Sequence, residues 1–289
     1  MKALLTLAFI LSFNSMASLI PKNDLRIPST EKSQALDEGT FNKIIDQIEA
    51  IYGPHILKHE GYPLIVKRLW DNDRVNAYSK KNTDQNKKIV SYEIGAFGGL
   101  ARYQHTTEDS FKLVLCHEIG HLIGGAPTWK PFSQASSEGQ ADYFSTMKCF
   151  KRLEKHSNNK AIIEGFDIPS LGKDKCKAVY KNKADYFLCL RQIKAIEEIS
   201  YTFADLSGLS TRPQLDTPDP YVRMFILFND YPNPQCRVDT LFAGTLCNVA
   251  NDDHLSLKLY NLGMCTDYSG HEYGLRPKCW YVEREEDKK

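Results

Sequence analysis

The chain of 289 residues has no cysteine before Cys116 and no long apolar run after its first few residues. Outside the N-terminus, no stretch reaches the roughly 18 apolar residues that a membrane-spanning helix requires, so we expect no integral membrane segment there. Charge is also balanced, with 37 Lys and Arg against 36 Asp and Glu. This balance gives no support to nucleic acid as a partner. There is no internal repeat, which argues against a solenoid.

The apolar run at the N-terminus is typical of a secretory signal. Lys2 precedes an apolar run that ends at Phe13, and the small residues Ser15 and Ala17 follow at the positions that a signal peptidase requires. We therefore expect residues 1–17 to be a cleaved signal peptide and the mature chain to be exported, either to the periplasm or out of the cell. The alternative is a retained N-terminal anchor, although the run is short for a bilayer span.

A candidate metal-binding motif follows Cys116. The segment His117-Glu118-Ile119-Gly120-His121 matches H-E-x-x-H, the signature of zinc hydrolases. Residues four positions apart lie on the same face of a helix, so the two imidazoles can converge on one zinc ion. Glu118 then lies beside the metal as a candidate general base. The pattern alone is suggestive only, because short motifs also arise by chance.

A second acidic segment supplies a third ligand. A helix is predicted to begin near Ser137, with Glu138 in its first turn and Asp142 one turn further on. His, His and Glu form a standard ligand set of catalytic zinc, which keeps its fourth position for water. The Asp142 carboxylate is placed to accept the outer N–H of a ligand imidazole. The alternative interpretation is that Glu138 and Asp142 cap a solvated helix.

All eight cysteines lie from Cys116 onward, an even number that favours disulfides in an exported chain. Eight cysteines allow 105 pairings, so the connectivity stays open. If residues 235–249 form one helix, Cys236 and Cys247 lie about 16 Å apart and cannot pair with each other. Cys116 points about 100° away from His117, so we expect a buried thiol or a disulfide there and not a metal ligand.

Hydrophobic periodicity and turn signals predict an α+β fold, mainly helical, with a small β-sheet ahead of the H-E-x-x-H helix. We expect one domain over residues 18–289, with its core at about 36–250 and a disulfide-bearing extension at 251–289. The predicted elements are a helix at 36–52 ended by Gly53-Pro54, strands at 64–70, 74–79 and 88–94, a zinc helix capped by Thr106 or Thr107, short surface helices within 148–183, a core helix at 184–206 and a loop at 207–220.

The chain resembles the gluzincin metallopeptidases, specifically the HtpX and CAAX-prenyl-protease class, which includes soluble BepA-like envelope proteases. Four pieces carry the resemblance: Asn76-Ala77-Tyr78, the motif from His117 to His121, the E-x-x-A-D segment from Glu138 to Asp142, and Tyr231-Pro232 with Arg237. It implies a zincin-like fold, a bound Zn2+ and hydrolysis of peptide bonds. The interval of 16 residues between His121 and Glu138 is shorter than is usual in this class.

At the start of the last piece, the family has a histidine that helps to stabilise the oxyanion, and this chain has Tyr231. A phenol can donate a hydrogen bond to a developing oxyanion, which makes Tyr231 a candidate catalytic residue. The alternatives are that Tyr231 is a packed aromatic side chain or that His271 reaches the site. We expect His105, His156 and His254 to be surface residues because they lie in polar stretches.

Together these features predict an exported zinc-dependent endopeptidase that acts on polypeptides, with unfolded or misassembled envelope proteins as the expected substrates. A strand at 74–79 or at 88–94 is expected to lie at the sheet edge and to bind an extended substrate by strand addition. Two alternatives stay open. One is a zinc hydrolase of a non-protein cell-wall amide, and the other is a catalytically silent zinc-containing binding or chaperone protein.

Overall fold

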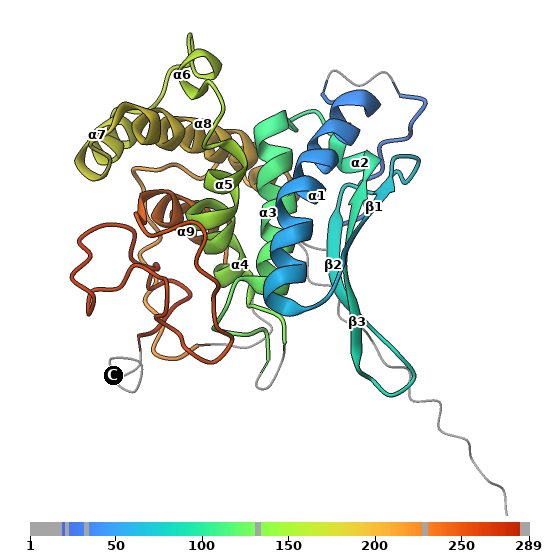
Figure 1. Ribbon diagram of the computed structural model, residues 1–289. Helices are drawn as coiled ribbons and strands as arrows, with labels where there is room; N and C mark the ends of the chain where they lie inside the picture. Colours follow the sequence, from blue (N-terminus) through green and yellow to red (C-terminus); the bar gives the residue numbers. More distant parts are fainter. Residues whose placement is uncertain (1–18, 21–22, 32–34, 131–133, 227–230, 284–289) are drawn as a thin grey trace, which may run out of the picture.

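A small sheet and a larger set of helices form an α+β fold (Figure 1). The computed structural model describes residues 19–20, 23–31, 35–130, 134–226 and 231–283. Its elements are α1 (Glu38–Glu60), β1 (Leu64–Leu69), β2 (Ala77–Thr83), β3 (Ile89–Phe97), α2 (Gly98–Ala101), α3 (Glu108–Ile123), α4 (Glu138–Phe144), a π-helical turn η1 (Ser145–Cys149), α5 (Phe150–Glu154), α6 (Asn159–Ile162), α7 (Ser170–Val179), α8 (Lys183–Leu206) and α9 (Pro234–Leu246).

The sheet has the strand order β1-β3-β2, with β3 parallel to β1 and antiparallel to β2. The prediction that residues 88–94 lie at an edge is therefore wrong, because this segment belongs to the central strand. β2 is an edge strand, although it begins three residues later than predicted. Residues just before it pair instead with the N-terminal part of the chain, where Ile27 N donates to Asp73 O at 2.8 Å.

Helix α1 continues through Gly53 and Pro54, where the sequence predicted its end. A proline inside a helix costs one backbone hydrogen bond and adds a clash. The apolar face, however, continues past the proline, and both Tyr52 and Ile56 are fully buried. Their burial offsets the local cost, and the helix ends at Gly61, whose φ of 79° is the left-handed conformation of a C-cap.

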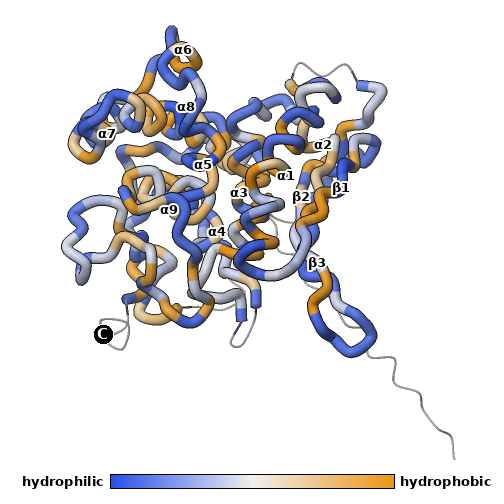
Figure 2. Tube along the Cα trace, in the orientation of Figure 1, coloured by the Kyte–Doolittle hydropathy of each residue, from blue (hydrophilic) through white to orange (hydrophobic). Residues whose placement is uncertain are grey.

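Helix α3 lies in the middle of the molecule, between the sheet with α1 on one side and α4 with α8 on the other (Figure 1). Its start is confirmed at Thr107, which forms a capping box with Ser110. Gly120 lets α4 approach closely, since a Cβ atom there would lie only 2.8 Å from the Cα atom of Ala141. Figure 2 shows apolar segments along α1 and α3, whereas the tip of the β2–β3 hairpin is hydrophilic.

Four disulfides cross-link the part of the chain after the sheet. They join Cys116 to Cys149, Cys176 to Cys189, Cys236 to Cys279 and Cys247 to Cys265. The expectations that Cys236 and Cys247 do not pair with each other and that Cys116 is a buried thiol or disulfide are confirmed. The last two bonds tie the C-terminal extension to α9 and its end. Such a set is compatible with an exported protein.

Among the described residues, no helix combines the length and the apolar character needed to cross a bilayer.

Candidate metal centre

Three side chains from α3 and α4 converge on one point. His117 and His121 lie one turn apart on α3, and Glu138 is the first residue of α4. Their potential ligand atoms all lie within 4.8 Å of one another, and all three residues are buried. The Nε2 atoms of His117 and His121 lie 3.2 and 3.6 Å from the two carboxylate oxygens of Glu138. The structure thus brings together the three ligands that the sequence predicted.

The atoms that face this point lack hydrogen bonds. His117 Nε2, His121 Nε2 and both carboxylate oxygens of Glu138 are buried with no hydrogen-bond partner. A buried polar group left unsatisfied costs about 1–3 kcal/mol. Four such atoms around one point fit a cation that would satisfy all of them. This group could therefore hold a metal ion, and two imidazoles with one carboxylate suit zinc.

The outer nitrogens of the two imidazoles are each held by an acceptor. His117 Nδ1 donates to Asp142 Oδ1 at 2.8 Å, and His121 Nδ1 donates to the carbonyl oxygen of Ser136 at the same distance. Both contacts fix the tautomer that leaves Nε2 as the metal-facing atom. In the metal-free chain, burial opposes protonation of His117, but the Asp142 and Glu138 carboxylates outweigh it and raise the pKa of His117 to about 9. A metal ion therefore competes with a proton for this ring.

Arg237 of α9 supports Asp142 from behind. Its Nε and Nη2 atoms donate to the two Asp142 oxygens at 2.8 Å each, and its guanidinium lies 4.8 Å from the ring centroid of Phe203. Burial raises the pKa of Asp142, but the Arg237 charge outweighs burial and lowers it, so the carboxylate stays ionised. No separate role is predicted for Arg237 from the sequence. Its only signal was its place in the last piece of the family resemblance.

Glu118 lies beside the three ligands and does not belong to their group. Its Oε1 atom accepts a hydrogen bond of 3.1 Å from the backbone nitrogen of Leu19, and its Oε2 atom is buried without a partner. Burial raises the pKa of Glu118 despite the opposing influence of the two imidazoles. A carboxylate with a raised pKa is suited to accept and return a proton near neutral pH.

The remaining candidates are Tyr231, His271 and the histidines expected at the surface. Tyr231 is 38% exposed, and its ring meets Trp129 edge-on with centroids 5.5 Å apart. Its phenol also contributes to the raised pKa of Arg237, the residue that supports Asp142. His271 belongs to a C-terminal loop, where its Nδ1 atom lies 3.3 Å from Thr266 O. Of the histidines expected at the surface, His156 and His254 are exposed and His105 is half-buried.

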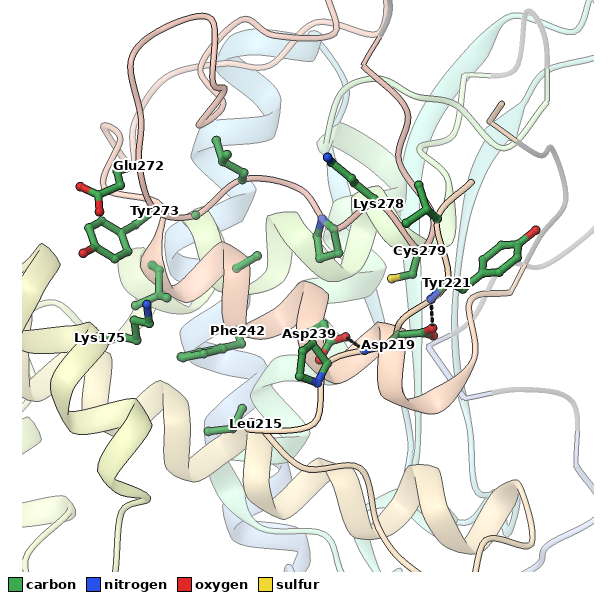
Figure 3. Close-up of a pocket in the computed structure, with 17 residues that line it drawn as sticks. Lys175, Leu215, Asp219, Tyr221, Asp239, Phe242, Glu272, Tyr273, Lys278 and Cys279 are labelled. Atoms are coloured by element: carbon green, nitrogen blue, oxygen red, sulfur yellow. Dashed lines mark hydrogen bonds between the residues drawn. The ribbon is translucent and has the colours of Figure 1, made fainter. Parts of the chain in front are cut away.

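A separate cavity of about 530 Å³ lies against α9 and the C-terminal extension (Figure 3). Its two half-buried carboxylates accept hydrogen bonds from the local backbone: Asp239 accepts from Asp219 N at 2.7 Å, and Asp219 accepts from Tyr221 N at 2.8 Å. Asp219 also lies near Cys236 and Cys279, but these two sulfurs are joined in a disulfide and are not free to ligate. None of the three predicted metal ligands lines this cavity.

No protein-family model matches the chain, and no curated protein or solved structure matches it either. The function is therefore inferred from the residues of the site.

Proposed function

We propose that this protein is an exported zinc-dependent endopeptidase of the gluzincin type with a zincin-like fold, similar to the HtpX and CAAX-prenyl-protease class. One observation carries the proposal. Four buried donor atoms of His117, His121 and Glu138 face one point without hydrogen bonds, and the Glu118 carboxylate lies beside them without belonging to the ligand group. A purely structural zinc site has no use for such a carboxylate.

His117, His121 and Glu138 would hold a zinc ion, which when bound would supply Lewis acidity at the scissile carbonyl and lower the pKa of water. Glu118 takes a proton from the attacking water and gives it to the leaving amide nitrogen, so that a carboxylate and an amine are formed. Asp142 and the Ser136 carbonyl keep the imidazoles oriented, and the Tyr231 phenol is the candidate donor to the developing oxyanion.

The proposed substrate is an extended polypeptide, for which β2 offers a binding edge. β2 packs against α3, the helix that carries His117 and Glu118. One edge of β2 pairs with β3, and the proposed peptide would pair with the other edge. A peptide added to this edge is recognised mainly through backbone hydrogen bonds, which suits unfolded chains of varied sequence.

The test compares the parent with Glu118→Gln and with a matched control, Glu108→Gln, which removes an exposed carboxylate from the first turn of the same helix. Zinc content and cleavage of unfolded casein are measured on the chain from Ser18 and, because Leu19 contacts Glu118, on a chain that begins at Asn23. We expect one zinc in every variant and cleavage reduced about 10²- to 10⁴-fold only in Glu118→Gln.

Absence of zinc from the parent would reject the metal site and the activity together. One zinc in the parent with no casein cleavage by either chain length would reject the general endopeptidase. That result would favour the hydrolase of a cell-wall amide or the zinc-containing binding protein.

A further inference from the structure

The N-terminal segment Leu19–Ile20 lies inside the candidate active site. Both residues are fully buried, with 1% and 0% of their surface exposed. The backbone of Leu19 is held at both ends: its nitrogen donates to Glu118 Oε1 at 3.1 Å, and its carbonyl oxygen accepts from Arg237 Nη1. The two partners are thus the proposed general base and the guanidinium that supports Asp142.

Burial of apolar side chains alone does not explain these contacts. A core segment normally pairs its backbone within a helix or sheet, whereas Leu19 pairs with side chains 99 and 218 positions away in the sequence. Arg237 uses Nε and Nη2 for Asp142, and its remaining nitrogen meets the Leu19 carbonyl. Glu118 and Arg237 thus pair with both backbone groups of one residue, as an enzyme pairs with a residue of its peptide substrate.

The next described residues along the chain pair beside the segment that leads into β2. Residues 23–27 lie antiparallel to residues 73–75, with a bridge between Arg26 and Arg74 and a hydrogen bond of 3.3 Å from Val75 N to Leu25 O. Because the two segments are antiparallel, the chain from Ile27 back to Asn23 runs alongside residues 73–75 toward the start of β2. β2, which follows residues 73–75, packs against α3, the helix that carries Glu118.

We propose that the Leu19–Ile20 segment is an intramolecular pseudosubstrate that blocks the metal centre. This inference rests on the proposed function. In that reaction Glu118 gives its proton to the leaving nitrogen, and the nitrogen that now faces Glu118 is that of Leu19. Leu19 therefore stands in the place of the substrate residue that follows the scissile bond. The site opens to a polypeptide only when the segment is displaced.

The test uses the zinc-loaded chain from Ser18, a chain from Asn23 that keeps the pairing with residues 73–75, and Leu19→Glu. The matched control is Leu25→Glu, which places the same charge on a residue of the same segment that is 38% exposed. The first measurement is the rate at which an excess of chelator removes zinc. We expect at least a tenfold faster loss from the Asn23 chain and from Leu19→Glu, and no change in Leu25→Glu.

The second measurement adds the segment back. A synthetic peptide with the sequence of residues 18–22 should slow zinc loss from the Asn23 chain, and the same peptide with Glu at the position of Leu19 should not. Equal rates of zinc loss from all chains, with no effect of the peptide, would overturn the proposal. If the Asn23 chain fails to fold, shown by loss of its thermal transition, Leu19→Glu and its control decide in the same assay.

Casein cleavage separates this inference from the proposed function. Faster zinc loss from the opened chains without any cleavage would support the blocking segment and reject the endopeptidase. Equal cleavage by all chains together with equal rates of zinc loss would support the endopeptidase and reject the blocking segment.

Discussion

Replacement of Asp142 by Asn tests whether this carboxylate holds a metal ligand in place. Asp142 accepts three hydrogen bonds of 2.8 Å, one from His117 Nδ1 and two from Arg237. An amide keeps one acceptor oxygen and turns an NH2 group toward the remaining donors. Loss of such an outer contact typically weakens metal affinity about 10- to 100-fold, or about 1.4–2.7 kcal/mol. Breaking the buried ion pair also costs about 3–5 kcal/mol of folding stability.

The control separates these two effects. Asp109 is equally buried and accepts from Arg191 Nε and Nη2 at 2.9 and 2.6 Å, but it lies outside the metal centre. Asp109→Asn should therefore lower the free energy of unfolding by a similar amount and leave zinc affinity unchanged. Stability is measured by urea denaturation of the metal-free chains, and affinity by competition with a chromophoric chelator at fixed pH. Unchanged affinity in Asp142→Asn, or equal weakening in both variants, would refute the reasoning.

Two further predictions concern stability. Burial raises the pKa of Glu154, but the charges of Lys112 and Arg191 outweigh burial and lower this pKa from 4.5 to about 2. The ionised Glu154 carboxylate therefore stabilises the fold above about pH 5, and this stabilisation is lost as the pH falls toward 2. Urea denaturation should show a loss on the order of 3 kcal/mol over this range that is absent from Glu154→Gln; parallel pH profiles would contradict this. Replacing Cys116 and Cys149 by Ala opens a loop of 33 residues and should cost about 4 kcal/mol; an unchanged denaturation midpoint would contradict the chain-entropy argument.

Local sequence signals predicted the parts of the site that lie within one element. The four-residue spacing places His117 and His121 on one helix face, and Thr107 fixes where that helix begins. The position of Glu138 at the start of α4 follows from the same kind of signal. These features depend on helical geometry over a few residues, which the sequence contains directly.

Features that depend on distant contacts were missed or wrong. The sequence predicts a helix end at Gly53-Pro54 because the local cost of proline is visible there, whereas the burial of Tyr52 and Ile56 that offsets this cost is not. The strand order follows from pairing that periodicity does not encode. The contact of Leu19 with Glu118 joins residues 99 positions apart, and no local pattern indicates it.

The uneven distribution of disulfides gives the two walls of the site different resistance to opening. In the wall that contains the metal ligands, Cys116–Cys149 joins α3 to η1 and Cys236–Cys279 joins α9 to the C-terminal extension. The wall formed by the sheet and α1 has no cysteine and is held by packing, such as Phe41 against Phe111 at 5.6 Å. Partial unfolding therefore separates the sheet layer first, at a lower free energy than global unfolding. The metal ligands stay in register during such an event, so a bound ion would be retained after β2 has separated.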